Sequence, residues 1–222
     1  MRHLFIINPA AGKKGTTAQL ETLLKELSFP HEVVYTEREG DARRFTEEAV
    51  RTGEPVRIYA CGGDGTLNEV VNGAAGYANA AVTNVPKGTG NDFLKIFGPG
   101  YRSLFYDLEA LAAGPQTPFD LIDCNGRLGI DVVCAGVDAR IAADVHRYKD
   151  WWFVSGIGAY ILALLENIFF KGIARTMTVH MGDIQWEDQP ASLLCVCNGR
   201  HYGGGFMPVG EAMPDDGVLD ML

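Results

Sequence analysis

At residues 62–68 the chain reads Gly62-Gly63-Asp64-Gly65-Thr66-Leu67-Asn68, shortly after the apolar run Val56–Ala60. An apolar run followed by helical periodicity predicts a strand that turns into a helix. Because glycine has no Cβ, successive N–H groups in such a turn can converge on phosphate oxygens near the positive end of the helix. Asp64 would repel a phosphate, so we expect it to act on a metal ion, a water or an acceptor hydroxyl. The alternative is a simple turn in which Asp64 caps the helix.

The first half of the chain alternates between strand and helix patterns. The expected strands are Leu4–Ile7, Val33–Tyr35, Val56–Ala60 and Ala80–Val85. The expected helices lie around Leu20–Leu27 behind Thr16 and Thr17 as caps, after Asp41 as a cap, and from Leu67 to Val71. Such alternation predicts an α/β fold with a parallel sheet covered by helices on both faces. Ligands of these sheets bind beyond the carboxyl ends of the strands, where the glycine-rich turns lie.

The pattern changes near Gly114-Pro115, so we expect domains at 1–115 and 116–222. Asn125-Gly126 predicts a hairpin turn between Phe119–Asp123 and Leu128–Cys134. The remaining expected elements are helices at Asp138–Tyr148 and Ile157–Phe169, and strands at Ala174–His180, Ile184–Trp186 and Ser192–Cys197. The second domain is therefore expected to be mainly antiparallel β.

Composition excludes some classes of function. The formal charge of −9 over 222 residues argues against nucleic-acid binding. The five cysteines show no metal-ligand spacing, and we expect reduced core thiols in a cytoplasmic protein. The apolar stretch Trp151–Phe170 contains polar residues and is too short to span a bilayer. Residues 1–7 read as a strand that runs into Asn8-Pro9, so we expect no signal peptide in them.

Two further loops follow expected strands. Asn8-Pro9-Ala10-Ala11-Gly12-Lys13-Lys14-Gly15 has small residues and lysines suited to phosphate, although it lacks the first glycine and the Ser/Thr of a P-loop. Pro86-Lys87-Gly88-Thr89-Gly90-Asn91-Asp92-Phe93 places a hydroxyl between two glycines. Asn91 and Asp92 could orient an acceptor or cap the following helix. Solvated lysines in an ordinary loop are the alternative for the first loop.

These three loops together resemble the diacylglycerol kinase catalytic domain family, which includes bacterial lipid kinases and the sphingosine and ceramide kinases. The resemblance extends to two later regions. These regions contain Asp131, Val133, Gly136, Asp138 and Ala139, then Asn198-Gly199, Gly203-Gly204-Gly205, Pro208 and Pro214-Asp215-Asp216-Gly217-Val218-Leu219-Asp220. The resemblance implies ATP-dependent, Mg²⁺-dependent phosphorylation of a lipid hydroxyl such as that of diacylglycerol.

The same resemblance implies roles for individual residues. Asp64 would be the catalytic carboxylate. The nucleotide would be lined by Asn8, Pro9, Ala10, Ala11, Gly12, Thr36, Gly62, Gly63, Asp64, Gly65, Thr66, Leu67, Asn68 and Thr89. A Mg²⁺ would be held by Asp216 with the backbone carbonyls of Met213 and Val218. Catalysis would consist of placement and charge neutralisation of the transferring phosphoryl group.

The chain departs from this family at its end. Relatives continue beyond Leu222, adding strands and a carboxylate proposed as general base, so we expect a fragment. An unpaired terminal strand would expose an edge and favour a homodimer. Arg140, His146, Arg147 and Lys149 precede Trp151-Trp152-Phe153, a pattern that suits peripheral contact with the inner face of a membrane. A core helix with a solvated polar lead-in is the alternative.

Two other functions remain open from the sequence. NAD kinases also carry a Gly-Gly-Asp-Gly-Thr loop on a related fold, but the Gly88–Phe93 loop and the apolar helix favour a lipid over a dinucleotide. A nucleotide-binding module without activity is the other alternative, because the end at Leu222 removes the proposed base.

Overall fold

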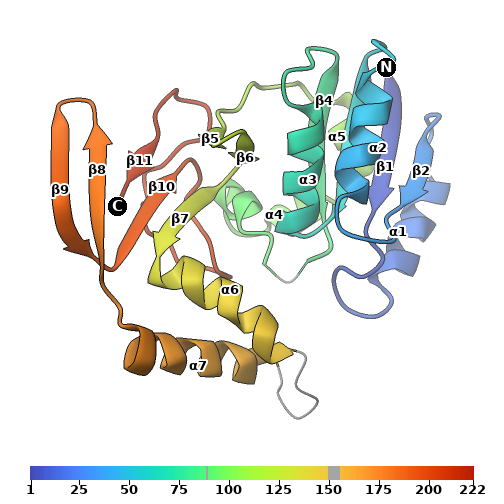
Figure 1. Ribbon diagram of the computed structural model, residues 1–222. Helices are drawn as coiled ribbons and strands as arrows, with labels where there is room; N and C mark the ends of the chain where they lie inside the picture. Colours follow the sequence, from blue (N-terminus) through green and yellow to red (C-terminus); the bar gives the residue numbers. More distant parts are fainter. Residues whose placement is uncertain (89, 150–155) are drawn as a thin grey trace. The chain divides into compact units, whose positions relative to one another are not determined.

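The computed structural model describes residues 1–88, 90–149 and 156–222, and its elements are shown in Figure 1. The chain forms two compact units. The first contains Met1–Val132 and Asn198–Leu219, and the second contains Val133–Cys197 and Asp220–Leu222. The chain therefore leaves the first unit and comes back to it before its last residues. The predicted domain boundary near residue 115 stays a prediction.

A four-stranded parallel sheet forms the centre of the first unit. Its strands are β1 (Arg2–Ile7), β2 (Glu32–Tyr35), β3 (Val56–Gly62) and β4 (Ala80–Pro86), in the order β2-β1-β3-β4. Every neighbouring pair is parallel, as the alternating pattern predicted. All carboxyl ends therefore lie along one edge, where the three loops begin.

Helices cover both faces of this sheet, as expected. Residues of α2 (Asp41–Val50) and α3 (Asp64–Ala74) pack with Leu4, Ile6 and Ile58 on one face. Residues of α1 (Thr16–Lys25) and α5 (Leu108–Ala113) pack with alternate residues of the same strands, among them Phe5 and Tyr59, on the other. Successive side chains of a strand point to opposite faces, which explains the two cores.

The predicted helix caps are wrong at α1 and α2. Glycines with positive φ, Gly15 and Gly40, precede α1 and α2, so Thr16 and Asp41 lie inside the first turns. The Asp41 carboxylate accepts hydrogen bonds from the preceding N–H groups of residues 37 and 38. Asp92 precedes the 3-10 helix η1 (Phe93–Phe97) but makes no side-chain capping bond there.

The rest of the first unit is built from short elements. These are α4 (Tyr101–Leu104), the antiparallel hairpin of β5 (Ile122–Cys124) and β6 (Arg127–Gly129), and the returning segment Asn198–Leu219. Asn125 and Gly126 have φ values of 52° and 81°, which confirms the predicted Asn-Gly turn.

The second unit contains antiparallel strands and two helices. β11 (Asp220–Met221), β10 (Leu193–Cys197) and β7 (Val132–Gly136) form one sheet, and β8 (Arg175–Met181) pairs with β9 (Ile184–Ala191). α6 (Val137–Lys149) packs on α7 (Gly156–Glu166), which continues into the π-helix η2 (Asn167–Lys171). The predicted aromatic cluster at residues 151–153 lies outside the described residues. Among the helices described, none has the length and apolar character needed to cross a bilayer.

Candidate active site

The turns after β3 and β4 lie against each other. Gly62 at the end of β3 pairs with Pro86 at the end of β4, and its carbonyl accepts hydrogen bonds from the N–H groups of Lys87 and Gly88. A Cβ on Gly88 would lie 2.6 Å from the Cα of Gly63. The two backbones approach too closely for a side chain, so glycine at position 88 is required by packing.

The loop after β1 joins the same group of turns. The Asn8 side chain donates to Thr66 Oγ1 at 3.1 Å, and its Oδ1 accepts from the N–H of Ala10 at 3.0 Å. A Cβ on Gly12 would lie 2.2 Å from the carbonyl oxygen of Lys87. The three loops singled out in the sequence therefore form one continuous surface at the carboxyl edge of the sheet.

A buried lysine, which the sequence reasoning did not assign to the site, holds this surface together. Lys87 is 3% exposed, and its Nζ donates to the carbonyl oxygen of Asn8 at 2.8 Å and to Thr17 Oγ1 at 2.7 Å. Burial lowers the pKa of this ammonium group. Both acceptors are neutral, so neither offsets its positive charge beside the loops expected to meet phosphate, and the charge of Glu21 acts on it from farther away.

Two carboxylates face each other where α3 begins. Asp64 Oδ1 accepts a hydrogen bond of 2.7 Å from the N–H of Asp92. A Cβ on Gly90 would lie 3.0 Å from Asp64 Oδ2 and 3.8 Å from Asp92 Oδ1, so both groups border the same space. Burial, and then the charge of Asp92, raise the pKa of Asp64. Asp92 itself forms an ion pair with Lys95 and accepts from the N–H of Gly204 at 2.7 Å.

A third carboxylate, Asp131, belongs to the same cluster. Burial raises its pKa to about 8, and the negative charges of Asp64 and Asp92 add to this effect. Its Oδ1 is buried without a hydrogen-bond partner. A Cβ on Gly199 would lie 2.0 Å from that oxygen, so the returning segment passes directly against it.

This cluster suits a hard divalent cation. The carboxylates of Asp64, Asp92 and Asp131, with one buried oxygen of Asp131 unpaired, provide the oxygen ligands that Mg²⁺ prefers. A cation there would favour ionised carboxyl groups and satisfy Asp131 Oδ1. Asp64, Asp92 and Asp131 are thus the residues that could hold Mg²⁺, together with the oxygens of a phosphate.

Other residues predicted to line the nucleotide lie nearby in different roles. Thr36 is buried after β2, with its N–H bonded to the carbonyl of Ile7. The Leu67 side chain is 2% exposed and packs in the core, whereas Asn68 is partly exposed on α3. Pro9 and Ala10 are exposed, and Thr89 lies outside the described residues.

The residues predicted as a Mg²⁺ site form a separate exposed turn of the first unit. Asp216 Oδ1 accepts from the N–H of Val218 at 2.9 Å, and Met213 is exposed. Asp120 fastens this turn, since its Oδ2 accepts from the N–H of Gly217 at 2.7 Å. This ligand set stays a prediction.

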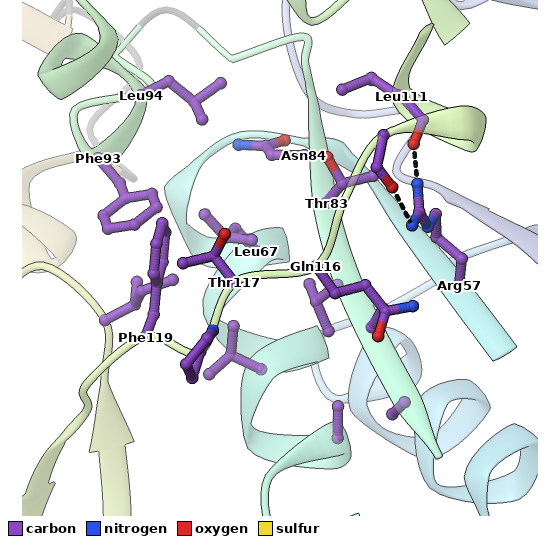
Figure 2. Close-up of a pocket in the computed structure, with 18 of the residues that line it drawn as sticks. Arg57, Leu67, Thr83, Asn84, Phe93, Leu94, Leu111, Gln116, Thr117 and Phe119 are labelled. Atoms are coloured by element: carbon purple, nitrogen blue, oxygen red, sulfur yellow. Dashed lines mark hydrogen bonds between the residues drawn. The ribbon is translucent and has the colours of Figure 1, made fainter. Parts of the chain in front are cut away.

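The first unit also contains an apolar cavity of about 710 Å³ (Figure 2). It is lined by side chains from α3, β4, η1 and the segment between residues 114 and 121, including Leu67, Phe93 and Phe119. The Asn84 side chain borders it, is 2% exposed, and has neither amide atom hydrogen-bonded. A ligand there would need both a donor and an acceptor facing Asn84.

Comparisons with known proteins identify the family of the chain. The family described as "Diacylglycerol kinase catalytic domain" matches residues 2–124, and "YegS C-terminal NAD kinase beta sandwich-like domain" matches residues 131–222. The chain belongs to the diacylglycerol kinase catalytic domain family. The predicted family and fold class are thereby confirmed.

Two bacterial relatives of the chain are named as probable lipid kinases. The chain is 35% identical over 196 residues to a "probable lipid kinase YegS-like" of Pseudomonas aeruginosa, over 84% of this chain and 60% of that protein. It is 30% identical to a protein of the same name from Shewanella frigidimarina, over 95% of this chain and 68% of the relative. The chain thus spans about three fifths of the length of the first relative.

A solved structure has the same fold. A diacylglycerol kinase from Bacillus anthracis superposes with a TM-score of 0.70 at 23% identity, over 99% of this chain and 74% of that one. Both units of the present chain therefore have counterparts in a known structure.

Proposed function

We propose that the protein transfers the γ-phosphoryl group of ATP to a lipid hydroxyl such as that of diacylglycerol, with Mg²⁺. One observation carries the proposal: the carboxylates of Asp64 and Asp92 border the same space beside glycine turns at the carboxyl edge of a parallel sheet, and their charges act on the buried carboxyl group of Asp131. Phosphoryl transfer requires carboxylates that bind a cation and, beside them, backbone N–H groups that bind phosphate oxygens. Membership of the family supports this chemistry.

The residues have distinct parts in this proposal. Backbone N–H groups of Gly62–Gly65 bind phosphate oxygens, and Asn8 fixes the adjoining loop through Thr66. When Mg²⁺ is bound, it neutralises part of the negative charge on the phosphates. Lys87 adds a fixed positive charge below the loops. Asp64, whose carboxylate borders the space beside the glycine turns, accepts the proton of the lipid hydroxyl.

We further propose that α7 and η2 contact the membrane that contains the lipid. Ile161, Leu165, Ile168 and Phe169 are exposed at helical spacing, and Phe170 is 87% exposed. On the opposite side of the helix, Ala159 and Ala163 are buried against α6. An apolar outer face on a helix too short to span a bilayer suits insertion at an interface.

A lipid-kinase assay tests the main proposal. The purified chain is incubated with ATP, Mg²⁺ and micelles containing a panel of neutral lipids, and the products are identified by mass spectrometry. We expect a phosphorylated lipid from the unmodified chain and from the control Asp183→Asn, which changes an exposed carboxylate in the β8–β9 turn. Asp64→Asn should reduce product by at least about 100-fold.

Parallel incubations separate the alternatives. Phosphorylation of NAD in place of every lipid would support the NAD kinase alternative. Binding of ATP in calorimetry without any product would indicate a nucleotide-binding module. Either result would reject the proposed reaction for this chain.

Vesicle co-sedimentation tests the membrane contact. Burial of a Phe side chain contributes about 1.5–3 kcal/mol, so losing two rings should weaken partitioning about 100-fold or more. Phe169→Ser with Phe170→Ser should show this loss, and the matched control Trp186→Ser, which removes an exposed aromatic of β9, should not. Equal partitioning of the two variants would contradict the assignment to α7 and η2.

A further inference from the structure

Two cysteines far apart in sequence meet in the second unit. Hydrogen bonds from Val137 N to Ser192 O and from Asn198 N to Asp131 O make β7 and β10 antiparallel neighbours. This register places Cys134 directly opposite Cys195, and their Sγ atoms are 3.2 Å apart. Sequence spacing gave no sign of this pair, because the two residues come from different strands.

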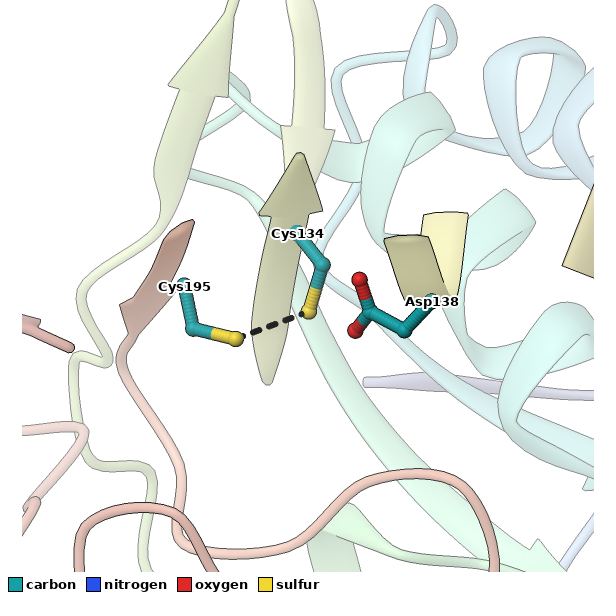
Figure 3. A group of neighbouring side chains, drawn as sticks. All are labelled: Cys134, Asp138 and Cys195. Carbon is teal, nitrogen blue, oxygen red and sulfur yellow. Dashed lines mark hydrogen bonds between the residues drawn. The ribbon is translucent and has the colours of Figure 1, made fainter. Parts of the chain in front are cut away.

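A carboxylate completes the group. Asp138, in the first turn of α6, points toward the two thiols, and one oxygen or sulfur from each residue lies within 4.8 Å of the others (Figure 3). Its Oδ1 accepts from the N–H of Ala139 at 2.8 Å. Its Oδ2 is buried without a well-formed hydrogen bond, and the Cys134 thiol within reach of this carboxylate is only a weak donor. Burial of the carboxylate is therefore costly, and a cation would reduce that cost.

The ligand set indicates the kind of cation. Thiolates are soft ligands that select zinc and similar metals, whereas Mg²⁺ and Ca²⁺ take oxygen ligands. Zinc binds Cys at about 2.3 Å and Asp at about 2.0–2.2 Å in a tetrahedral arrangement, so ligand atoms a few ångströms apart can reach one ion. Cys195 is fully buried and Cys134 is only partly so, and we expect a water as the fourth ligand.

We propose that Cys134, Asp138 and Cys195 bind a thiophilic divalent cation such as Zn²⁺. Binding forms two Zn–S bonds and one Zn–O bond, and the two thiol protons pass to solvent, so no oxidant or reductant is needed. The ion joins β7, β10 and the start of α6, and thereby stabilises the second unit. This site is separate in residues and in ligand chemistry from the carboxylates Asp64, Asp92 and Asp131.

Cobalt substitution tests the proposal directly. The chain is purified under reducing conditions, stripped with a chelator and titrated with Co²⁺, whose thiolate complexes have an intense charge-transfer absorption that carboxylate complexes lack. We expect the band to saturate at one Co²⁺ per chain and to disappear on addition of one equivalent of Zn²⁺. Zn²⁺ should also raise the melting temperature of the stripped protein.

Matched variants locate the site. Cys134→Ser and Cys195→Ala should each abolish the band, while Cys124→Ser, which changes an exposed thiol on β5, should retain it. Asp138→Asn should weaken Co²⁺ binding at least about tenfold while keeping the band, which distinguishes a ligand from a purely structural residue. Absence of the band in the reduced, unmodified chain would overturn the proposal. A Cys134–Cys195 disulfide found by mass spectrometry in protein that binds no metal after reduction would overturn it as well.

Discussion

Raising the pH should destabilise the metal-free protein through the buried carboxyl group of Asp131. The folded protein holds this group with a pKa of about 8, against an ordinary value of 3.8. Between these two values the native state keeps a proton that the unfolded chain has released. The stabilising contribution of the protonated group is therefore complete below pH 3.8 and is lost as the pH rises toward 8.

The size of this loss follows from proton linkage. One proton bound only by the native state changes the free energy of unfolding by about 1.4 kcal/mol per pH unit. From pH 5 to pH 7 the loss attributable to Asp131 should therefore approach about 3 kcal/mol. Asp131→Asn cannot ionise, so this part of the pH dependence should disappear in the variant.

Urea unfolding in the presence of a chelator measures the effect. The unmodified protein and Asp131→Asn are compared at pH 5, 6 and 7, and the difference between their free energies of unfolding should grow in favour of the variant as the pH rises. Adding Mg²⁺ at pH 7 should stabilise the unmodified protein more than the variant, because the cation favours the ionised group. A difference that stays constant across these pH values would show that Asp131 does not keep its proton in the folded protein.

Two more substitutions probe the candidate site. Gly199→Ala places a Cβ 2.0 Å from Asp131 Oδ1, so we expect about 1–3 kcal/mol of destabilisation in urea unfolding and a large loss of phosphoryl transfer. The control Gly210→Ala meets only the flexible end of a Met side chain and should behave like the unmodified protein. Lys87→Met removes two buried hydrogen bonds of a charged group and should lower the free energy of unfolding by about 2–4 kcal/mol. Lys25→Met, at an exposed position of α1, should lower it by less than about 0.5 kcal/mol. An equal effect of the two lysine substitutions would argue against a structural role for Lys87.

The sheet of the first unit could be predicted because its signals are local. Apolar runs such as Val56–Ala60 are buried along their whole length, and the helical spacing of Leu67, Val70 and Val71 marks a buried face. The caps were predicted wrongly because Gly15 and Gly40 adopt positive φ and take the cap positions. The neighbouring Thr16 and Asp41 are common cap residues, so the sequence favoured them instead.

The carboxylate cluster could be predicted only in part. Asp64 stands in an evident glycine turn, but Asp92 was interpreted as a cap or an orienting residue and Asp131 only as a family position. Their proximity depends on the return of Gly199 and Gly204 to the first unit, about 70 residues after the chain leaves it. The pairing of Cys134 with Cys195 likewise depends on strand register, which residue spacing does not encode.

A crystal structure of the protein with a non-hydrolysable ATP analogue and Mn²⁺, which replaces Mg²⁺ and is located by its anomalous scattering, tests the central claim most directly. We expect an anomalous peak among Asp64, Asp92 and Asp131, with phosphate oxygens against the backbone of Gly62–Gly65. A nucleotide bound away from these turns, or a metal peak without any of these three carboxylates, would contradict it.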